Sequence, residues 1–437
     1  MQSSQLFSLP FLLAVSLPLA GCQSPSTFAE GLSPSGYALA PSAVTLLVGD
    51  SLTVRLIDPK ADTLPPTSAA WSTNDSLVVT IDQQGHLLAH GSGQAVVTAT
   101  LPAGALSAGV IVRTPARPAA IQFGLHMNLT FEPDRLRRSQ VARADRALGA
   151  VVSRGTFDWS RVERTQGARD WAEMDSIVAE FQGFGLEPLM VVMGSPAWAN
   201  GVAPSTADAE LYVPQDSAAF TTWTAQYAAF MTEAASRYSG RIRKWELWNE
   251  ENDIYFWKPV PNLDRYVQWY GAVAAAIKKV DPTAQVSIGG LSGLCCTGPT
   301  GINGFAFLEG LYSRGVSLDI VAIHPYPDGQ QGPEVTLPHR NNFTDIERVH
   351  SIMVAHGAGD RPLWITEWGW STAAVSEATQ ATYVERSLQM IYDQYTYVTL
   401  ATYFLDYDRA GYPYGLADSS LRPKPAGLRF RDFVSSH

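Results

Sequence analysis

Residues 245–252 read Trp-Glu-Leu-Trp-Asn-Glu-Glu-Asn, and residues 363–370 read Leu-Trp-Ile-Thr-Glu-Trp-Gly-Trp. In each stretch a glutamate, Glu250 or Glu367, follows a short apolar run and has tryptophan close by. The two glutamates are 117 residues apart, or about 39 residues for each of three strand–helix units. Catalytic groups of a (β/α)₈ barrel lie at the carboxyl ends of its strands. The spacing therefore predicts that Glu250 ends strand four and Glu367 ends strand seven of such a barrel.

Two carboxyl groups at the mouth of one barrel are suited to cleaving a bond between sugars. One acid protonates the leaving oxygen, the other carboxylate attacks or stabilises the anomeric carbon, and flat aromatic rings stack on the sugar. Glu246 and Glu251 compete with Glu250 for the acid role. Glu246 faces the same side of its strand but lies deeper, and Glu251 does not follow an asparagine. Glu250 is therefore the stronger candidate.

Composition narrows the class of protein. A chain of 437 residues is long enough for more than one domain. With 46% hydrophobic and 16% charged residues, it is neither a disordered chain nor a membrane bundle. The net charge of −10, with no basic stripe to offset it, argues against a nucleic-acid partner.

The amino-terminal residues resemble an export signal. Residues 6–19 are apolar but too short for a confident membrane span, and residues 19–22, Leu-Ala-Gly-Cys, resemble the lipobox of bacterial lipoproteins, in which Cys22 would carry the lipid. Residues 1–5 lack Lys and Arg, which departs from that pattern, and an ordinary secretory signal is the alternative. We expect a signal peptide over residues 1–21 and a flexible tether over residues 22–40, which are rich in Ser, Pro and Gly.

Residues 41–116 are predicted to form a small all-β sandwich. Strand-like runs at 44–48, 51–57, 78–81 and 95–100 are separated by Gly, Asp, Asn and Pro turns. Segments 44–52, 71–75, 81–87 and 91–95 resemble, in that order, the bacterial immunoglobulin-like group 2 domain. The resemblance implies a spacer. Carbohydrate binding is the alternative, but Trp71 is the only tryptophan of the segment and no aromatic stripe supports that role.

Residues 117–437 are predicted to form the (β/α)₈ barrel. Short apolar runs alternate with amphipathic segments, which is typical of strand–helix units. The expected strands are 121–127, 150–154, 188–193, 242–248, 285–289, 320–324, 363–367 and 401–405. The expected helices include 170–184, 218–238, 263–280, 305–314, 345–355, 377–392 and 426–434. A three-layer doubly wound fold is the alternative, but no Gly-rich phosphate loop supports it.

The residues at the expected strand ends resemble clan A of the glycoside hydrolases, over about residues 119–432. The closest resemblance is to the region shared by families 39 and 5 and their exopolysaccharide-degrading relatives. The matching positions, in order, are Arg154 of strand two, Ser195-Pro196-Ala197-Trp198 after strand three, Asn249-Glu250 of strand four, His324-Pro325-Tyr326 of strand six, Glu367 of strand seven, and Tyr414-Gly415-Leu416 with Arg422-Pro423-Lys424-Pro425 after strand eight.

The resemblance implies that Glu250 is the general acid/base and Glu367 the nucleophile. The surroundings of Glu250 should raise its pKa, partly through the charge on Glu367. Arg154 and Tyr326 would stabilise the Glu367 carboxylate. Asn249 would hydrogen-bond the sugar 2-hydroxyl. Two alternatives stay open: Arg154 as a structural salt-bridge residue, and His324 as a residue that only shapes the site.

The aromatic residues that bind sugar are harder to assign. Trp198 and Trp368 are expected to bind substrate, while tryptophans 248, 257 and 370 also fall near predicted strand ends. A tryptophan at such a position packs in the core about as often as it binds sugar. The clan commonly has a Trp at strand eight, whereas residues 403–408 read Tyr-Phe-Leu-Asp-Tyr-Asp. Phe404, or else Tyr403, would take its place.

Cys295 and Cys296 are adjacent, after strand five. In an oxidising compartment they are expected to form a vicinal disulfide; two free thiols or pairing with another chain are the alternatives. Their spacing does not suit zinc.

These observations predict a retaining glycoside hydrolase that acts on a β-linked poly- or oligosaccharide at the cell surface. No cofactor, metal or nucleic-acid partner is expected, and the membrane would be reached only through the lipid on Cys22. A transglycosylase with the same glutamate pair and a non-catalytic sugar-binding lipoprotein are the alternatives. Intact Glu250 and Glu367 argue against the latter.

Overall fold

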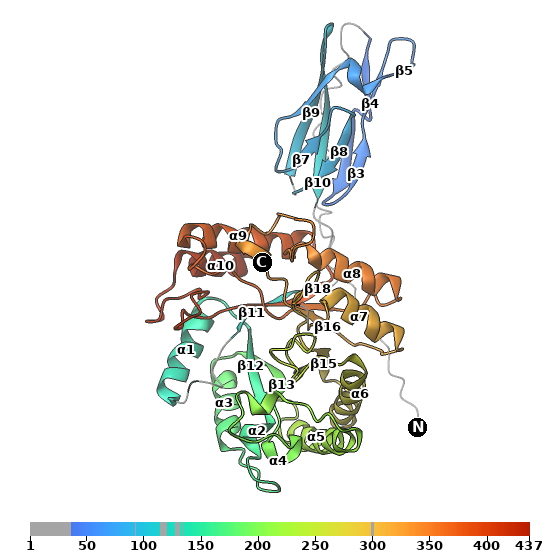
Figure 1. The fold of residues 1–437 in the computed structure, drawn as a ribbon. Helices are drawn as coiled ribbons and strands as arrows, with labels where there is room; N and C mark the ends of the chain where they lie inside the picture. Colours follow the sequence, from blue (N-terminus) through green and yellow to red (C-terminus); the bar gives the residue numbers. More distant parts are fainter. Residues whose placement is uncertain (1–35, 92, 114–119, 127–131, 133, 299–300) are drawn as a thin grey trace, which may run out of the picture. The chain divides into compact units, whose positions relative to one another are not determined.

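The computed structural model describes residues 36–91, 93–113, 120–126, 132, 134–298 and 301–437 (Figure 1). The expected signal peptide, Cys22 and most of the expected tether lie outside these residues. The chain divides into two compact units between Thr114 and Pro115, and each is described by itself. No helix among the described residues has the length and apolar character needed to span a membrane.

The amino-terminal unit consists of small β-sheets, and most of its strand pairs are antiparallel. One sheet holds β1 (Ala38–Ala40), β4 (Arg55–Ile57) and β5 (Thr63–Leu64), and another holds β3 (Ser51–Thr53), β8 (His86–Ala89) and β7 (Val79–Ile81). The largest holds β2 (Ala43–Leu47), β10 (Gly104–Arg113), β9 (Gly93–Leu101) and β6 (Ala70–Thr73), with β2 parallel to β10. A 3₁₀ turn, η1 (Pro66–Ser68), precedes β6, and Trp71 donates its indole N–H to the carbonyl of Pro66 at 3.0 Å. Trp71 therefore packs in the core of this unit, where it is 4% exposed.

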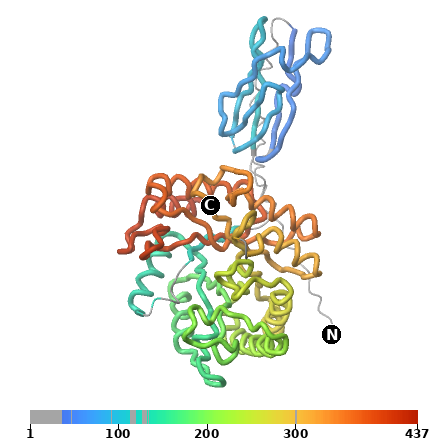
Figure 2. The backbone as a smooth tube through the Cα atoms, viewed as in Figure 1, coloured from blue at the N-terminus to red at the C-terminus, as the bar shows by residue number. Residues whose placement is uncertain are grey.

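The second unit is the predicted (β/α)₈ barrel. Its parallel strands follow one another in chain order: β11 (Gln122–His126), β12 (Val152–Asp158), β13 (Glu187–Met193), β14 (Lys244–Leu247), β15 (Gln285–Ile288), β16 (Val321–Ile323), β17 (Leu363–Ile365) and β18 (Val398–Tyr403). The first strand pairs with the last, and two isolated bridges, Ser287–Ile320 and Leu291–Ile323, connect β15 to β16. The trace in Figure 2 shows the resulting circular order, from teal through yellow to red.

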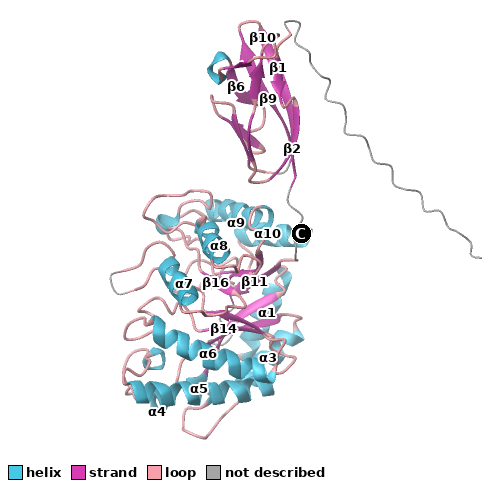
Figure 3. Cartoon of the chain, turned by 90° about the vertical axis from the view of Figure 1, so that its right-hand side faces the viewer, coloured by secondary structure: helices cyan, strands magenta, loops and turns pink. Residues whose placement is uncertain are grey.

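A helix follows each strand: α1 (Arg135–Ala147), α3 (Ala172–Gly183), α5 (Ser217–Arg237), α6 (Leu263–Val280), α7 (Gly304–Ser313), α8 (Asp345–Ala355), α9 (Glu377–Asp393) and α10 (Pro425–Ser436). Shorter elements are α2 (Trp159–Val162), α4 (Ala197–Asn200), η3 (Ala209–Leu211) and η4 (Asp328–Gln330). Neighbouring helices pack in pairs such as α5 with α6 and α9 with α10 (Figures 1 and 3). Side chains of Asn262, Asn303 and Ser376 accept backbone N–H groups where α6, α7 and α9 begin, which satisfies donors that a helix leaves unpaired there.

The expected strands all occur, although most are one to three residues shorter or shifted at an end. Helix α1 was not among the expected helices. Its sequence, RLRRSQVARADRA, carries charged residues on most of its surface, so it lacks the apolar stripe that predicts a helix.

The barrel interior changes from apolar to polar along the strands. One buried cluster fills the interior nearer the amino ends and comprises Val152, Leu189, Ile320, Ala322, Trp364 and Leu400. Two residues further along the same strands, on the same face, lie buried polar side chains: Arg154, Thr366 and Thr402. The apolar layer therefore forms a floor, and the polar layer above it faces the carboxyl ends of the strands.

Candidate active site

Glu250 lies in a tight turn directly after β14. The residues on either side of Asn249 have left-handed backbone angles, with φ of 80° at Trp248 and 45° at Glu250. Such angles are unfavourable for residues other than glycine and occur preferentially at functional sites. Hydrogen bonds hold the turn in place, because Trp248 donates its backbone N–H to Val192 at 2.8 Å and its indole N–H to the carbonyl of Phe256 at 3.0 Å.

Glu367 lies two residues beyond the end of β17, and its carboxylate faces that of Glu250. One ligand atom each of Glu250, His324 and Glu367 lie within 4.8 Å of one another. Both glutamate side chains keep a small exposed fraction, 16% for Glu250 and 11% for Glu367, in otherwise buried surroundings. The two carboxylates are therefore close together, and a substrate can reach both.

Arg154, in the barrel interior, hydrogen-bonds to three residues of the site. Its guanidinium donates to both oxygens of Glu246, at 2.8 and 3.0 Å, to Glu367 Oε1 at 2.6 Å and to Asn249 Oδ1 at 2.8 Å. The side chain has no exposed surface. Glu246, the alternative candidate for the acid role, is fully buried. It binds Arg154 through a bidentate ion pair, the geometry that a guanidinium favours.

The contact with Arg154 also orients Asn249. Since the amide oxygen accepts from the guanidinium, the amide nitrogen points the other way. It makes no hydrogen bond with another described residue. It is therefore free to donate to a sugar hydroxyl.

Glu367 is stabilised in its charged form. Burial raises the pKa of its carboxyl, but the neighbouring His324, Arg154 and His126 outweigh burial and hold the pKa well below its usual range. The Tyr326 hydroxyl donates to Glu367 Oε2 at 2.9 Å. Burial also raises the pKa of Tyr326 well above that of a free phenol, so it stays a donor.

Glu250 is shifted in the opposite direction. Burial raises the pKa of its carboxyl, and the charges of Glu367 and Asp253 add to the rise, while the contact with His324 opposes it. Two neighbouring carboxyl groups whose pKa values are pushed apart are the pattern of an acid and a nucleophile.

His324 lies against Glu250 and shares a proton with it. Nδ1 of His324 is 2.7 Å from Glu250 Oε1, and Nε2 is 3.1 Å from Thr366 Oγ1. The Thr366 hydroxyl donates its own proton to Glu246 Oε1 at 3.0 Å, so it can only accept from His324. Nε2 therefore carries a hydrogen, and in the neutral ring Nδ1 is left as an acceptor for a protonated Glu250. The backbone approaches closely here: a Cβ on Gly290 would lie 2.0 Å from His324 Nε2.

His126, at the end of β11, was not among the residues predicted to form the site. Arg154 Nη1 donates to its Nδ1 at 2.7 Å, and the same nitrogen lies 3.3 Å from Glu367 Oε1. Burial lowers the pKa of His126, which suits a neutral ring that accepts from Arg154. In the sequence, His126 could be recognised only as a polar residue at the end of the first expected strand.

Phe404 is the aromatic residue that lies beside the carboxylates. Its ring centroid is 5.1 Å from that of His126, 6.2 Å from Tyr326 and 5.5 Å from Tyr414, each edge to face. Phe404 is partly exposed, whereas Tyr403 is fully buried. Of the two candidates at strand eight, Phe404 is the one placed to contact a sugar.

The tryptophans expected to bind sugar lie elsewhere. Trp368 is fully buried and donates its indole N–H to Ser387 of α9 at 3.1 Å, so direct contact with substrate does not fit its position. Trp198 is only partly exposed, stacks edge to face on Trp159 and donates to the carbonyl of Glu163 at 2.9 Å. Tryptophans 248, 257 and 370 are also fully buried. These indoles build the core between barrel and helices.

Glu251 lies outside the site. It is fully buried, and burial raises the pKa of its carboxyl well above the usual range. It is therefore a neutral acid in the core beside Gly289, where a Cβ would lie 2.1 Å from Glu251 Oε2.

Cys295 and Cys296 are present as free cysteines whose sulfur atoms lie 2.7 Å apart. Both backbone N–H groups donate to Asn341 Oδ1, at 3.0 and 3.1 Å, and Asn341 Nδ2 donates to the carbonyl of Cys296. Asn341 in turn donates to Asp328, two residues after Tyr326. The cysteine loop is thus connected to the loop that carries a partner of Glu367.

The ligand atoms of Glu250, His324 and Glu367 are also close enough together to hold a metal ion. Each side chain, however, is already engaged: Glu250 with His324, and Glu367 with Arg154 and Tyr326. A divalent cation would have to displace these bonds next to a buried guanidinium. The arrangement suits acid–base chemistry better.

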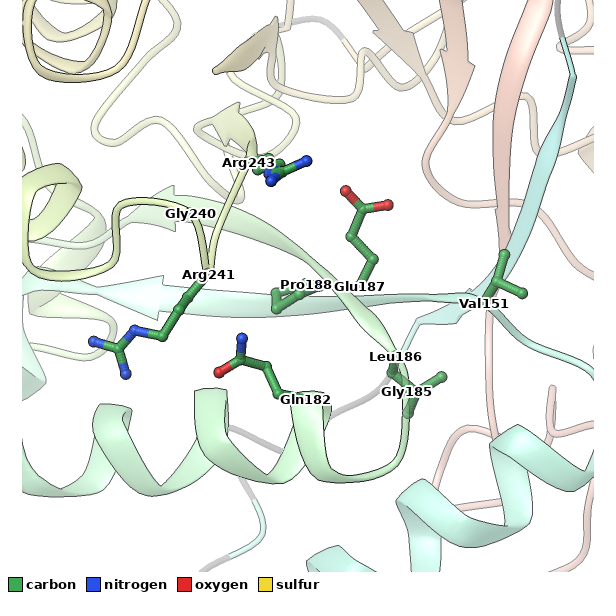
Figure 4. Close-up of a pocket in the computed structure, with 9 residues that line it drawn as sticks. All are labelled: Val151, Gln182, Gly185, Leu186, Glu187, Pro188, Gly240, Arg241 and Arg243. Carbon is green, nitrogen blue, oxygen red and sulfur yellow. The ribbon is translucent and has the colours of Figure 1, made fainter. Parts of the chain in front are cut away.

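A surface cavity of about 310 Å³ lies at the opposite end of the barrel (Figure 4). Gln182, Glu187, Arg241 and Arg243 line it, near the amino ends of β13 and β14. It is therefore separate from Glu250 and Glu367, which follow the carboxyl ends of their strands.

Comparisons with known proteins agree with this geometry. A family model described as "Glycosyl hydrolases family 39" matches residues 163–430. No curated protein sequence matches the chain. Among solved structures, a family 39 glycoside hydrolase from Bacteroides cellulosilyticus is 18% identical, with a TM-score of 0.56, over 90% of this chain and 81% of that one. A monomeric β-xylosidase from Caulobacter crescentus is 19% identical, with a TM-score of 0.54, over 73% and 68% of the two chains. The GH5_18 protein from Streptomyces cattleya, in complex with GlcNAc, is 14% identical, with a TM-score of 0.54, over 72% and 80%. At these identities the structures show a shared fold.

Proposed function

Because the chain belongs to glycosyl hydrolase family 39, we propose that it hydrolyses a β-linked poly- or oligosaccharide by double displacement, with retention at the anomeric carbon. The observation that carries the proposal is the pair Glu250 and Glu367. Their nearest ligand atoms lie within 4.8 Å, which fits the roughly 5–5.5 Å between the carboxyl groups of retaining enzymes. It does not fit the roughly 6.5–9.5 Å that leaves room for water in inverting ones.

In the first step Glu367 attacks the anomeric carbon. The bond from that carbon to the leaving oxygen breaks, and Glu250 gives its proton to the oxygen. His324 takes part by presenting Nδ1 to the protonated form of Glu250. In the second step Glu250, now ionised, takes a proton from water, and the resulting hydroxyl displaces Glu367 from the anomeric carbon.

Neighbouring residues favour the transition state. Arg154 and Tyr326 keep Glu367 ionised and aimed before attack. The free amide N–H of Asn249 is suited to the sugar 2-hydroxyl, a contact that strengthens in the transition state. Phe404 presents a ring to the apolar face of the sugar.

Proton NMR of the first-formed product, on a panel of β-linked polysaccharides, tests the proposal. We expect the β anomer to appear first. An α anomer would contradict double displacement. In Glu250→Ala, added azide should restore turnover of substrates with good leaving groups by attacking the glycosyl-enzyme, and a β-glycosyl azide should accumulate.

We also propose that the protein is exported and held at the cell surface by lipid on Cys22, with the amino-terminal unit as a spacer. The lipobox-like residues 19–22 support this location. Cys22→Ala should move the protein from the membrane fraction to the soluble one. Continued membrane association of Cys22→Ala would contradict the lipid anchor.

A further inference from the structure

Exposed apolar side chains concentrate at one end of the barrel unit. Among its described residues, eight large hydrophobic side chains are exposed, and three of them, Leu136, Val354 and Leu428, lie on helices. The other five lie in the loops that follow β14, β16 and β18: Tyr255, Val260, Val335, Leu337 and Tyr412. These loops carry or flank the catalytic residues.

Tyr255 is the most exposed of the five, at 74%. Its backbone is nevertheless held beside the acid/base: Tyr255 donates its N–H to Asp253 Oδ1 at 2.9 Å, and Asp253 donates its own to the carbonyl of Glu250 at 2.7 Å. The ring makes no hydrogen bond with another described residue. It is a flat apolar surface with a polar tip, fixed at its base and open to solvent.

Tyr412 has the same character in the loop after β18. It is 58% exposed and lies in a tight turn closed by two backbone hydrogen bonds with Arg409. The next residue, Pro413, accepts from the backbone and hydroxyl of Thr372 in the loop after Glu367. Two residues on, Tyr414 packs against Phe404. Tyr412 is therefore an exposed ring two residues before Tyr414, which contacts Phe404 of the site.

The two tyrosines lie in loops that follow strands on opposite sides of the barrel. Three strands separate β14 from β18 in either direction around the barrel. With strands about 4.8 Å apart and tilted by about 36°, eight strands enclose a ring about 15 Å across. A single sugar ring cannot span that distance, whereas a chain of several sugars crossing Glu250 and Glu367 would meet a tyrosine at each end.

We propose that Tyr255 and Tyr412 are stacking platforms for distant sugars, that the site takes an extended β-linked chain, and that the chain is cut internally. This inference rests on the proposed function. Rings of this kind contact the apolar face of a sugar while the hydroxyl reaches water or a sugar hydroxyl. A sugar chain that is bound on both sides of Glu250 and Glu367 can be cleaved at an internal bond, without a chain end in the site.

The test measures binding and cleavage separately. Binding of β-1,4-linked xylo-, gluco- and manno-oligosaccharides, from disaccharide to hexasaccharide, is measured by calorimetry in the Glu367→Gln background. Adding Tyr255→Ala or Tyr412→Ala should weaken binding of the longest oligosaccharides about five- to tenfold, with a loss that grows with length. Tyr→Phe at either position keeps the ring and should retain most of the affinity. Leu428→Ala removes an exposed apolar side chain on α10 and should change nothing.

Product sizing on the polysaccharide completes the test. The active protein should release fragments of mixed length early, with a fall in viscosity that precedes release of single sugars. Unchanged affinity in both alanine variants, or single sugars as the first products, would overturn the inference. Length-dependent binding without any bond cleavage by the unmutated protein would contradict the proposed function while leaving the platforms in place.

Discussion

Nδ1 of His324 lies 2.7 Å from Oε1 of Glu250, and the hydroxyl of Thr366 fixes the hydrogen of His324 on the opposite ring nitrogen. Glu250, the proposed acid, therefore faces a hydrogen-bond acceptor while the ring is neutral, whereas a protonated ring would favour ionised Glu250. A chain of hydrogen bonds runs from Glu246 through Thr366 to His324 in the barrel interior. It determines which nitrogen of the His324 ring carries the hydrogen, and therefore whether the other nitrogen accepts the proton of Glu250.

Thr366→Val is expected to shift the pH dependence of the reaction. Glu250 works as an acid while protonated, so activity is lost as pH rises through its raised pKa; Glu367 works while ionised, so activity is lost only below its depressed pKa. Without the Thr366 hydroxyl, His324 can carry its hydrogen on Nδ1 and donate to ionised Glu250. The basic limb of kcat/KM should then move to lower pH.

A matched control exists on α5. The Thr224 hydroxyl is buried without a hydrogen-bond partner among the described residues. Thr224→Val should leave both limbs in place. An unmoved basic limb in Thr366→Val would contradict the assigned direction of the hydrogen-bond chain.

Glu367→Gln should abolish turnover, with kcat lower by on the order of 10⁴-fold, because an amide is nearly isosteric but a poor nucleophile. The melting temperature should change little. Glu251→Gln is the control: Glu251 is already held neutral by burial, so an amide there should change neither quantity greatly. Residual activity of Glu367→Gln near that of the unmutated protein would exclude Glu367 as the nucleophile.

Arg154→Lys should lower both activity and stability. Lysine keeps the charge but cannot bridge Glu246, Glu367 and Asn249 at once. We expect a loss of about 2 kcal/mol in the free energy of unfolding and a fall in kcat larger than the rise in KM, measured by denaturant titration and steady-state kinetics. Arg138→Lys, at the buried pair with Glu180 on α1 and α3, should lose stability with kcat unchanged. Equal kcat values in the two variants would make Arg154 purely structural.

Chelation should leave turnover unchanged. Glu250, His324 and Glu367 could hold a metal ion, but the proposed mechanism uses protons and a carboxylate alone. Dialysis against EDTA, with metal content followed by mass spectrometry, should not alter kcat. Activity lost on chelation and recovered with one added divalent cation would assign that group a metal after all.

Cys295 and Cys296 are expected to form a vicinal disulfide when the protein is exposed to an oxidising disulfide, which is reduced to its dithiol as the two cysteines lose two hydrogens. The unreduced peptide spanning residues 294–297 should be two hydrogens lighter than the dithiol. Alkylation must be carried out unfolded, because the neighbouring Cys296 and burial raise the pKa of the Cys295 thiol to about 11 and slow its reaction in the fold. Two alkyl groups on the unreduced, unfolded chain would show two free thiols.

The sequence predicts those parts of the site that strand periodicity determines. Glu250, Glu367 and Arg154 follow apolar runs, and parallel strands bring their ends to one face of the barrel. The position of Trp368 could not be predicted in this way: β17 ends at Ile365, so strand alternation no longer determines the direction of this side chain, and the indole donates to Ser387 on α9. Trp368 follows Glu367 directly in the sequence, but its indole lies in the core.

The remaining site residues depend on contacts that no single segment reveals. Thr366 and His126 are ordinary polar residues in the sequence, and only the register of β11, β16 and β17 brings them to Glu246, His324 and Arg154. Tyr255 and Tyr412 stand out only by exposure in the folded chain. Exposure and register are properties of the assembled barrel.

The distribution of tryptophan gives the protein an internal optical reporter. Nine indoles of the barrel unit are fully buried, and the amino-terminal unit holds Trp71 alone. Intrinsic fluorescence should therefore follow the unfolding of the barrel almost exclusively, with a red shift as these rings meet water. Far-ultraviolet circular dichroism also registers the strands of the other unit. A difference between the two unfolding curves would reveal whether the two units melt together or one at a time.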